Sequence, residues 1–286
     1  MIRFLVRRTG IAIVRLIAMV LVLGTLTQFS LWLLDEPRQV WQLAGSFDSA
    51  ELADFSKRSI ASFRVLAICW TTVVIFGLMI GILSARFRQS RGMKLFWMPF
   101  MVASWVPAFW LVCLAALWLL EGWGHPGFAD GEAPVRVEGL NQWWHASLLG
   151  VILAAGAIGF QYRICREGII RRGTQQEFIR SSFMRGHRRS TIFYDHILKN
   201  SMPALTGVID RGLPATLGML AVSEWAFRYP GLGQFLVEGA RLGMPEAVFL
   251  TAVVFSGVVI LVTLLAEWIH GILDRRIRTG PYPIHY

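Results

Sequence analysis

Residues 174–203 read TQQEFIRSSFMRGHRRSTIFYDHILKNSMP, the longest polar and strongly basic stretch of a chain that is otherwise mostly apolar. Thr174 and Glu177 have the spacing of a capping box, in which each side chain satisfies the free backbone N–H of the other at a helix start. Gly186 follows where this short helix would end, because glycine tolerates the left-handed turn of a C-terminal cap. The first half of the stretch therefore predicts a short helix that ends at a glycine corner.

The second half of the stretch has a helical pattern of its own. Ser190 can start a helix that carries Ile192, Phe193 and Ile197 on one face, and Pro203 would end it. By itself, this organisation is as typical of a solvated connector as of a docking surface.

The composition of the chain indicates a membrane protein. Of its 286 residues, 55% are hydrophobic and only 16% are charged, whereas soluble domains are about a quarter charged. The net charge of +10 would suggest nucleic acid in a soluble protein. Here the positive residues gather in alternate loops, which the positive-inside rule explains better, so nucleic acid is not an expected partner. The three cysteines have no spacing typical of a disulfide framework or a metal site.

Six apolar segments are predicted to cross the membrane as helices, since about 20 apolar residues suffice for one crossing. They cover residues 10–34, 63–85, 95–120, 146–162, 204–227 and 247–272. The alternative for the first segment is a signal peptide, but the run is too long and lacks a small-residue cleavage site, so we expect a retained span. Arg15, near its start, could extend back to the interface. A short amphipathic helix is also predicted around residues 49–55.

The loops give the predicted orientation. Basic residues follow the second, fourth and sixth spans, whereas residues 35–62 and 121–145 are acidic or rich in glycine and tryptophan. The positive-inside rule therefore places both termini in the cytoplasm. The expected fold class is an all-α membrane protein with six transmembrane helices. The fourth span is rich in glycine and alanine, which let helix backbones approach closely.

Three ionisable residues fall in the predicted fifth span. Asp210 and Arg211 are costly there unless they face a cavity or a partner, so they are candidates for a translocation path or a subunit interface. The alternative is that they pair with each other or with another helix, or lie at a shallower depth. Glu224, near the outer boundary, is either functional or a water-facing residue at the end of the span. Pro107, in the third span, is predicted to kink that helix.

The run Tyr229-Pro230-Gly231-Leu232-Gly233 predicts a tight turn on the external side, in which proline presets one residue and glycine supplies a positive φ. The sequence shows no phosphate-binding glycine loop, so this chain should not bind ATP itself. The six histidines have no spacing typical of a metal site, and we find no nucleophile–base arrangement.

The order of these features resembles the permease subunit of binding-protein-dependent ABC importers, in the dipeptide, oligopeptide and nickel subfamily, and within it the B-type of the two paired permeases. Four local runs carry the resemblance. Residues 177–186, with Pro203 seventeen residues later, are similar to the family's cytoplasmic coupling motif, and residues 227–233, with Glu224 upstream, to its external turn. Residues 104–111 and 273–278 resemble the family's third-span and closing motifs.

The resemblance implies a type I ABC importer permease fold. Residues 1–62 would form the first transmembrane helix and an external loop, residues 63–278 the permease core, and residues 279–286 a cytoplasmic tail. A coupling helix at about 175–189 would contact the ATPase through its motif residues, namely Glu177, Phe178, Arg180, Ser181, Ser182, Phe183, Arg185, Gly186 and Pro203. Pro230, Gly231 and Gly233 would form the external turn.

The resemblance also implies the partners. They are a homologous second permease in a heterodimer, two cytoplasmic ATPase subunits that hold ATP and Mg²⁺, an external substrate-binding protein and the bilayer of the bacterial inner membrane. The chain itself would carry no cofactor, metal or catalytic residue. ATP binding would bring the two coupling helices together and tilt the attached spans, a rigid-body switch.

The chain departs from the family pattern at several points. Ser181 and Ser182 stand where small residues such as alanine are common, Arg180 replaces an acidic residue, and Arg275 replaces a proline. The first external loop is short and lacks the subfamily's Gly-Asp-Leu-Gly signature. Dipeptides, longer or antimicrobial peptides, polyamines, haem and nickel therefore all stay open as substrates.

Two other functions compete with a permease subunit. A self-contained, ion-coupled secondary transporter would use Asp210, Arg211 and Glu224 as an ion relay and would have no need of a structured cytoplasmic helix. An intramembrane enzyme would need a convergent acid–base or metal set, which the sequence does not display.

Overall fold

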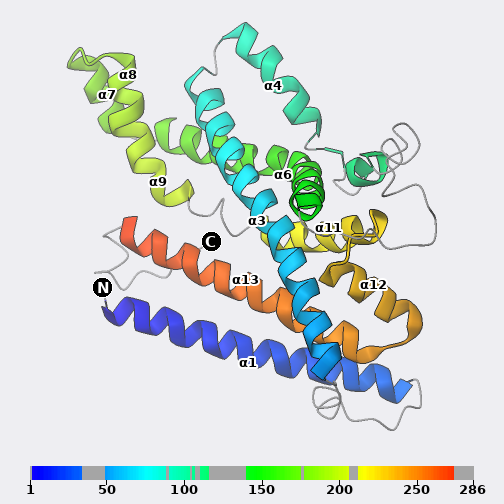
Figure 1. Cartoon of the computed structure of the whole chain (residues 1–286). Helices are drawn as coiled ribbons and strands as arrows, with labels where there is room; N and C mark the ends of the chain where they lie inside the picture. The colour runs from blue at the N-terminus through cyan, green and yellow to red at the C-terminus, as the bar shows by residue number, and fades with distance from the viewer. Residues whose placement is uncertain are drawn as a thin grey trace.

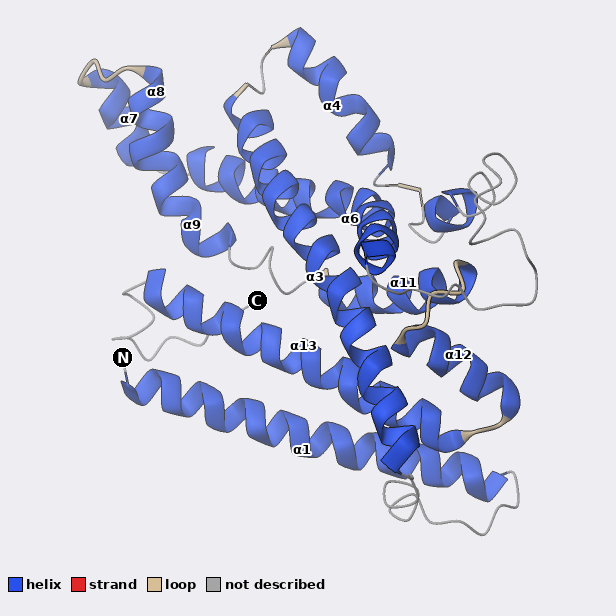
Figure 2. Cartoon of the chain, in the orientation of Figure 1, coloured by secondary structure: helices blue, strands red, loops and turns tan. Residues whose placement is uncertain are grey.

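The computed structural model describes residues 2–33, 49–87, 90–103, 105–106, 110–115, 140–174, 177–205 and 212–273. Every regular element among them is a helix (Figure 2). Four of these helices contain stretches that are long and apolar enough to cross a membrane, at Phe4–Gln28, Glu51–Arg86, Trp143–Arg171 and Pro245–Leu273. They belong to α1 (Ile2–Leu33), α3 (Ser49–Arg86), α6 (Leu140–Thr174) and α13 (Pro245–Leu273).

These four helices agree with the predicted first, second, fourth and sixth spans, but all four are longer. The amphipathic segment at 49–55 is not a separate helix, because α3 continues through it into the span. Likewise α6 continues beyond residue 162 through the basic residues that follow, as far as Thr174. Arginine and lysine are good helix formers, so a basic loop sequence does not end a helix that the apolar run has started.

The predicted third and fifth spans are described only in parts. Within the third, α4 (Arg91–Ala103) is helical and so are residues 110–115, whereas Pro107 lies outside the described residues. Within the fifth, α9 (Lys199–Leu205) and α11 (Leu213–Ala226) are described, whereas Asp210 and Arg211 are not. Neither α4 nor α11 reaches the length of about 20 residues that one crossing needs.

Helices α3 and α6 pack in parallel at short distance, and glycines allow the approach. A Cβ at Gly81 would lie 2.5 Å from the Sγ of Cys165, and one at Gly77 would lie 3.0 Å from the Cβ of Gln161. Gly77 and Gly81 are four residues apart, so they share one face of α3 as in other closely packed transmembrane helices. The carboxyl ends of α3 and α6 therefore point to the same side of the molecule.

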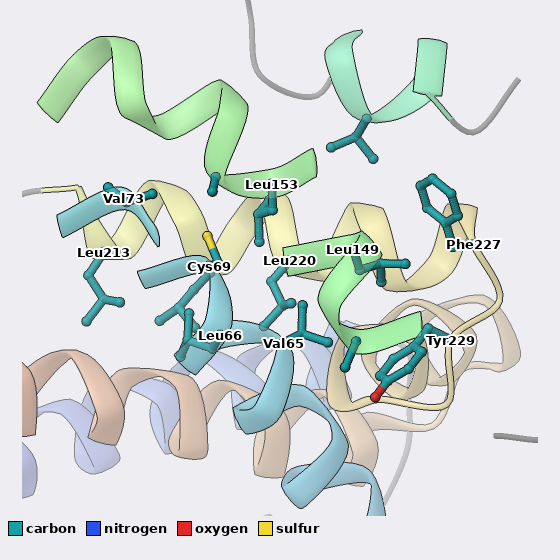
Figure 3. Close-up of a cluster of buried hydrophobic side chains, with 14 residues drawn as sticks. Val65, Leu66, Cys69, Val73, Leu149, Leu153, Leu213, Leu220, Phe227 and Tyr229 are labelled. Atoms are coloured by element: carbon teal, nitrogen blue, oxygen red, sulfur yellow. The ribbon is translucent and has the colours of Figure 1, made fainter. Parts of the chain in front are cut away.

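The main apolar core lies between α3, α6 and α11 (Figure 3). Its buried members include Val65 and Cys69 of α3, Leu149 and Leu153 of α6, and Leu220 of α11. Aromatic side chains of the turn after α11, Phe227 and Tyr229, close the cluster at one end. The core thus joins three helices that are far apart in sequence.

The first and last described helices, α1 and α13, lie side by side and run antiparallel (Figure 1). The ring of Phe4 lies against Gly271, and Leu23 packs on Phe249 at the other end of the pair. The start of α1 and the end of α13 therefore lie on the same side.

Candidate functional site

The basic stretch at 174–203 folds as a helical corner beside the carboxyl end of α6. Helix α7 (Glu177–Met184) follows α6, and Gly186 has a φ of +78°, the left-handed conformation that favours glycine. The N–H of His187 donates to the carbonyl of Ser182 at 3.3 Å, and the N–H of Arg185 donates to that of Ser181 at 3.1 Å. These bonds close the last turn of α7 as in a Schellman cap, so the predicted glycine corner is confirmed.

The described helix α6 extends further than predicted. Thr174 is its last residue and α7 begins at Glu177, while residues 175–176 and the side chains of Thr174 and Glu177 lie outside the described part, so the capping box stays a prediction. Helix α6 extends as far as Thr174 because the only residues of low helix propensity between Arg163 and Thr174 are Gly168 and Gly173. Single glycines are tolerated inside helices.

Helix α7 has a buried side and an exposed side. Ile179 and Ser182 are buried, whereas Ser181, Met184 and Arg185 are exposed, with Met184 at 86%. Methionine and arginine are both enriched at protein interfaces. The small Ser182 lets α7 lie close to the helices behind it.

The second half of the stretch is also helical. It runs through α8 (Arg189–Thr191), a π-helical segment η1 (Ile192–Leu198) and α9, which continues past Pro203 to Leu205. Ile192 and Phe193 are buried, and Ile197 packs against the buried cluster that Phe193 forms with Cys165 and Ile169 of α6. The predicted apolar face of this segment is thus buried. Pro203 therefore does not end this helix, because residues on either side of it keep helical geometry.

Arg86, at the end of α3, fixes this second half in place. Its guanidinium lies 5.3 Å from the ring centroid of Phe193 and 5.4 Å from that of Tyr194, and its Nη1 donates to the carbonyl of Arg189 at 3.4 Å. Cation–π contacts of this kind contribute about 0.5–1 kcal/mol each at exposed sites. The sequence identifies Arg86 only as a positive loop residue, because its aromatic partners lie more than 100 positions later.

Not all predicted coupling residues have described side chains. Glu177, Phe178, Arg180, Phe183 and Pro203 belong to described helices, but their side chains lie outside the described part. Their predicted contact with an ATPase stays a prediction, as does that of Ser181, Ser182, Arg185 and Gly186.

The predicted external turn connects α11 to α12 (Leu232–Leu242), an amphipathic helix that the sequence analysis missed. The only positive φ of a non-glycine residue in the described chain is at Arg228, with 52°. Gly231 is extended, with φ −117°, so the prediction that glycine supplies the positive φ is wrong. Gly231 is required by space instead, because a Cβ there would collide with the carboxylate of Glu224.

Glu224 is fully buried and binds the amino end of α12. Its Oε2 accepts the N–H of Gly233 at 2.6 Å, and its Oε1 accepts the Oγ–H of Ser62 at 2.7 Å. The Oγ of Ser62 in turn accepts the N–H of Leu232 at 2.7 Å. A carboxylate at a helix N-terminus is stabilised by the free N–H groups and by the helix dipole. Glu224 therefore joins α11, α12 and α3 in one hydrogen-bonded unit.

The suggestion that Glu224 is a water-facing end residue is thus wrong, since its exposure is 0%. The nearby Tyr229 is also buried. Burial raises the pKa of its hydroxyl to about 12, and the neighbouring Glu224 acts in the same direction. Nothing in the sequence links Glu224 to Ser62, which lies 162 positions earlier.

Gly233 should tolerate no side chain. A Cβ there would lie 2.3 Å from the Cα of Ala221 and 2.9 Å from Oε2 of Glu224, so Gly233→Ala must push α12 away from α11. We expect a loss of about 1–3 kcal/mol of stability, typical of overpacking, measured as a lower midpoint of thermal unfolding in detergent.

Gly218 provides the matched control for this substitution. It lies in α11 with nothing within 4 Å of an added Cβ, so Gly218→Ala should stabilise the helix by about 1 kcal/mol. Equal midpoints for the two variants would contradict the predicted contact between α11 and α12.

The helical corner and the external turn lie at opposite ends of α3. Arg86 contacts the corner, whereas Phe55, near the other end, stacks edge-on against Phe235 of α12 with ring centroids 5.8 Å apart. Phe55 and Arg86 are about 46 Å apart along a helix that rises 1.5 Å per residue. This distance matches the 40–45 Å thickness of a bilayer with its headgroups. Figure 1 shows α7 and α8 at one end of the molecule and α12 at the other.

Among the described residues, no group of three or more His, Cys, Asp or Glu side chains comes together as metal ligands do. What the described parts provide is a structured, partly apolar surface at one end of α3 and a rigid buried network at the other.

Residues 77–279 match the family described as "Binding-protein-dependent transport system inner membrane component". The chain is 25% identical to the glutathione transport system permease protein of Pectobacterium atrosepticum over 263 residues, which cover 85% of this chain and 79% of that protein. It is 24% identical to the oligopeptide transport system permease protein of Bacillus subtilis over 174 residues, or 60% of this chain and 54% of that protein. A probable peptide ABC transporter permease protein of Sinorhizobium fredii is 26% identical over 142 residues.

Proposed function

Since this chain belongs to the family of binding-protein-dependent transport system inner membrane components, we propose that it forms one half of the translocation path of an importer. It is a multi-pass membrane protein and a permease subunit of an ABC transporter, and its relatives favour this function over a secondary transporter. The finer proposals are that six helices span the bacterial inner membrane and that both termini lie in the cytoplasm. The antiparallel pair of α1 and α13 supports the second of these.

The observation that carries the proposal is the separation of the two structured segments by the length of α3. We place α7 and Gly186 at the cytoplasmic face, where the arginines follow the spans, and α12 at the external face. In this arrangement the exposed side of α7, with Ser181, Met184 and Arg185, contacts an ATPase subunit. Because α7 packs on η1 and adjoins α6, a displacement of α7 moves α6, η1 and α3 together through Arg86.

The remaining partners follow from the family. We propose a heterodimer with a homologous permease, two ATPase subunits that bind ATP and Mg²⁺, and an external binding protein that delivers the substrate. This chain then contributes no catalytic group. The relatives' names support a peptide or a related small solute as substrate. Asp210, Arg211 and Pro107 stay candidates for the path or the subunit interface, whereas Glu224 is buried within this chain.

Two exposed methionines allow a direct test of the orientation. Met184 lies on α7 and Met244 lies between α12 and α13. In a Cys113→Ala background, in which the other cysteines, Cys69 and Cys165, are buried, we would introduce Met184→Cys or Met244→Cys. In intact spheroplasts, a membrane-impermeant maleimide should label only Met244→Cys. After permeabilisation it should label both.

The same pair tests the contact with an ATPase. A thiol-reactive, photoactivatable crosslinker, which needs no cysteine on the partner, should join Met184→Cys to an ATPase subunit and should not join Met244→Cys to it. Labelling of Met184→Cys in intact spheroplasts would overturn the orientation. Correct labelling without any crosslink would leave the orientation standing and would refute the docking of α7.

A further inference from the structure

A buried carboxylate binds two arginines where α1 packs on α13. Oε1 of Glu267 accepts hydrogen bonds from Nη1 of Arg8 at 3.3 Å and from Nη1 of Arg15 at 3.4 Å. Glu267 is 7% exposed, whereas the side chain of Arg15 is 49% exposed. Both arginines lie outside residues 77–279, the part of the chain that matches the family.

The direction of the Arg15 side chain follows from the register of the two helices. Phe4 lies against Gly271 and Arg8 against Glu267, so the antiparallel pair brings Arg8, not Arg15, to the level of Glu267. Arg15 is seven residues, or about 10 Å, further along α1. Its guanidinium therefore extends back toward the amino end of α1, as arginines do when they reach for the membrane interface.

Among the described residues, the charges where Arg8, Arg15 and Glu267 meet do not balance. Two guanidinium groups share one carboxylate, which leaves a surplus of one positive charge. Each guanidinium has five N–H donors, and among the described residues each donates a single hydrogen bond, to the same oxygen. Arg7, one position before Arg8, is also exposed.

The surroundings indicate where a further acceptor comes from. Ile13, Val14 and Ile17 flank Arg15 on α1 and are all more than half exposed, as on a helix face that contacts lipid. Glu267 lies six residues, or about 9 Å, before the end of α13, near the depth at which headgroups meet hydrocarbon.

We propose that the seam formed by Arg8, Arg15 and Glu267 binds the phosphate of an anionic phospholipid in the cytoplasmic leaflet. The surplus charge attracts the headgroup, the unused guanidinium N–H groups donate to its phosphate oxygens, and the exposed apolar side chains of α1 contact its acyl chains. If Glu267 served only to hold α1 on α13, one arginine would suffice.

The proposal is tested on the purified full-length protein in micelles that contain phosphatidylcholine and phosphatidylglycerol. Native mass spectrometry counts the phosphatidylglycerol retained per chain. Arg15→Gln should reduce retention about fivefold, since one hydrogen bond from its guanidinium to the phosphate is worth about 1 kcal/mol net. Arg91→Gln, the control, removes the same charge from an exposed arginine at the start of α4 and should change nothing.

Glu267→Gln gives the opposite expectation. It raises the surplus to two positive charges, so retention of phosphatidylglycerol should exceed that of the unaltered protein, and excess inorganic phosphate should not displace the lipid. Equal losses in Arg15→Gln and Arg91→Gln would indicate general charge attraction and overturn the proposal. So would unchanged or lower retention in a Glu267→Gln variant that elutes as a folded species, or displacement by inorganic phosphate.

Discussion

Replacing Gly186 by proline is expected to abolish ATP-driven transport while the chain stays folded in the membrane. Gly186 has a φ of +78°, whereas the proline ring holds φ near −65°. The chain can then no longer turn at the end of α7, and the exposed face of α7 loses its orientation. Gly186→Ala should have a smaller effect, about tenfold weaker association with the ATPase, because a side chain in the left-handed conformation costs about 1–2 kcal/mol.

Gly243 offers a closely matched control. Gly243 also has a positive φ, of +67°, and it ends α12 as Gly186 ends α7. At both positions an added Cβ would have no atom within 4 Å. Gly243→Ala should therefore cost similar stability, measured by thermal unfolding in detergent, but leave ATPase association intact. Equal losses of association in Gly186→Ala and Gly243→Ala would show that the effect is general destabilisation.

Replacing Glu224 by glutamine should weaken the attachment of α12 even though the two side chains have nearly the same size. An amide has only one oxygen, so either Ser62 or the N–H of Gly233 must face an NH₂ group instead of an acceptor. Hydrogen bonds to charged groups contribute about 1.5–3 kcal/mol each, and we expect a loss of stability of that size. The measurement is the unfolding midpoint, together with the rate of protease cleavage in the segment around α12.

Glu238→Gln serves as the control for Glu224→Gln. Glu238 lies on α12 itself and accepts one bond from Gln234 at a partly buried position, so its change should cost less than about 0.5 kcal/mol. A double-mutant cycle with Ser62→Ala should also give a coupling energy of at least about 0.5 kcal/mol, as for residues in one network. Additive effects of Ser62→Ala and Glu224→Gln would contradict the network.

Local signals in the sequence account for much of the helical corner formed by α7, α8, η1 and α9. Two short-range patterns predict features that the structure has. They are the glycine after an eight-residue helix and the spacing of Ile192, Phe193 and Ile197. The apolar run of the sixth span likewise predicts α13 within two residues at each end. Such features depend on neighbours in the chain, which a single sequence displays.

Features that depend on distant partners could not be predicted in the same way. In the sequence, Glu224 is an isolated charge in an apolar segment. In the structure, its carboxylate accepts hydrogen bonds from Ser62 and from the start of α12. In the sequence, Arg86 is only one of the basic residues that predict the membrane orientation. In the structure, its guanidinium contacts the rings of Phe193 and Tyr194. The sequence does not predict α12, because the glycines before it suggest a turn. Gly239, inside this helix, leaves room for the close approach of Ala247 of α13.

The most direct test of the account is purification of the tagged chain from its native membranes in mild detergent, with its partners identified by mass spectrometry. We predict that an ABC-type ATPase subunit and a second, homologous permease co-purify with the unaltered chain and with Gly243→Ala, and that the ATPase is lost from Gly186→Pro. Absence of any ATPase from the unaltered chain, or equal recovery with Gly186→Pro, would contradict the proposal that α7 and Gly186 couple this permease to ATP hydrolysis.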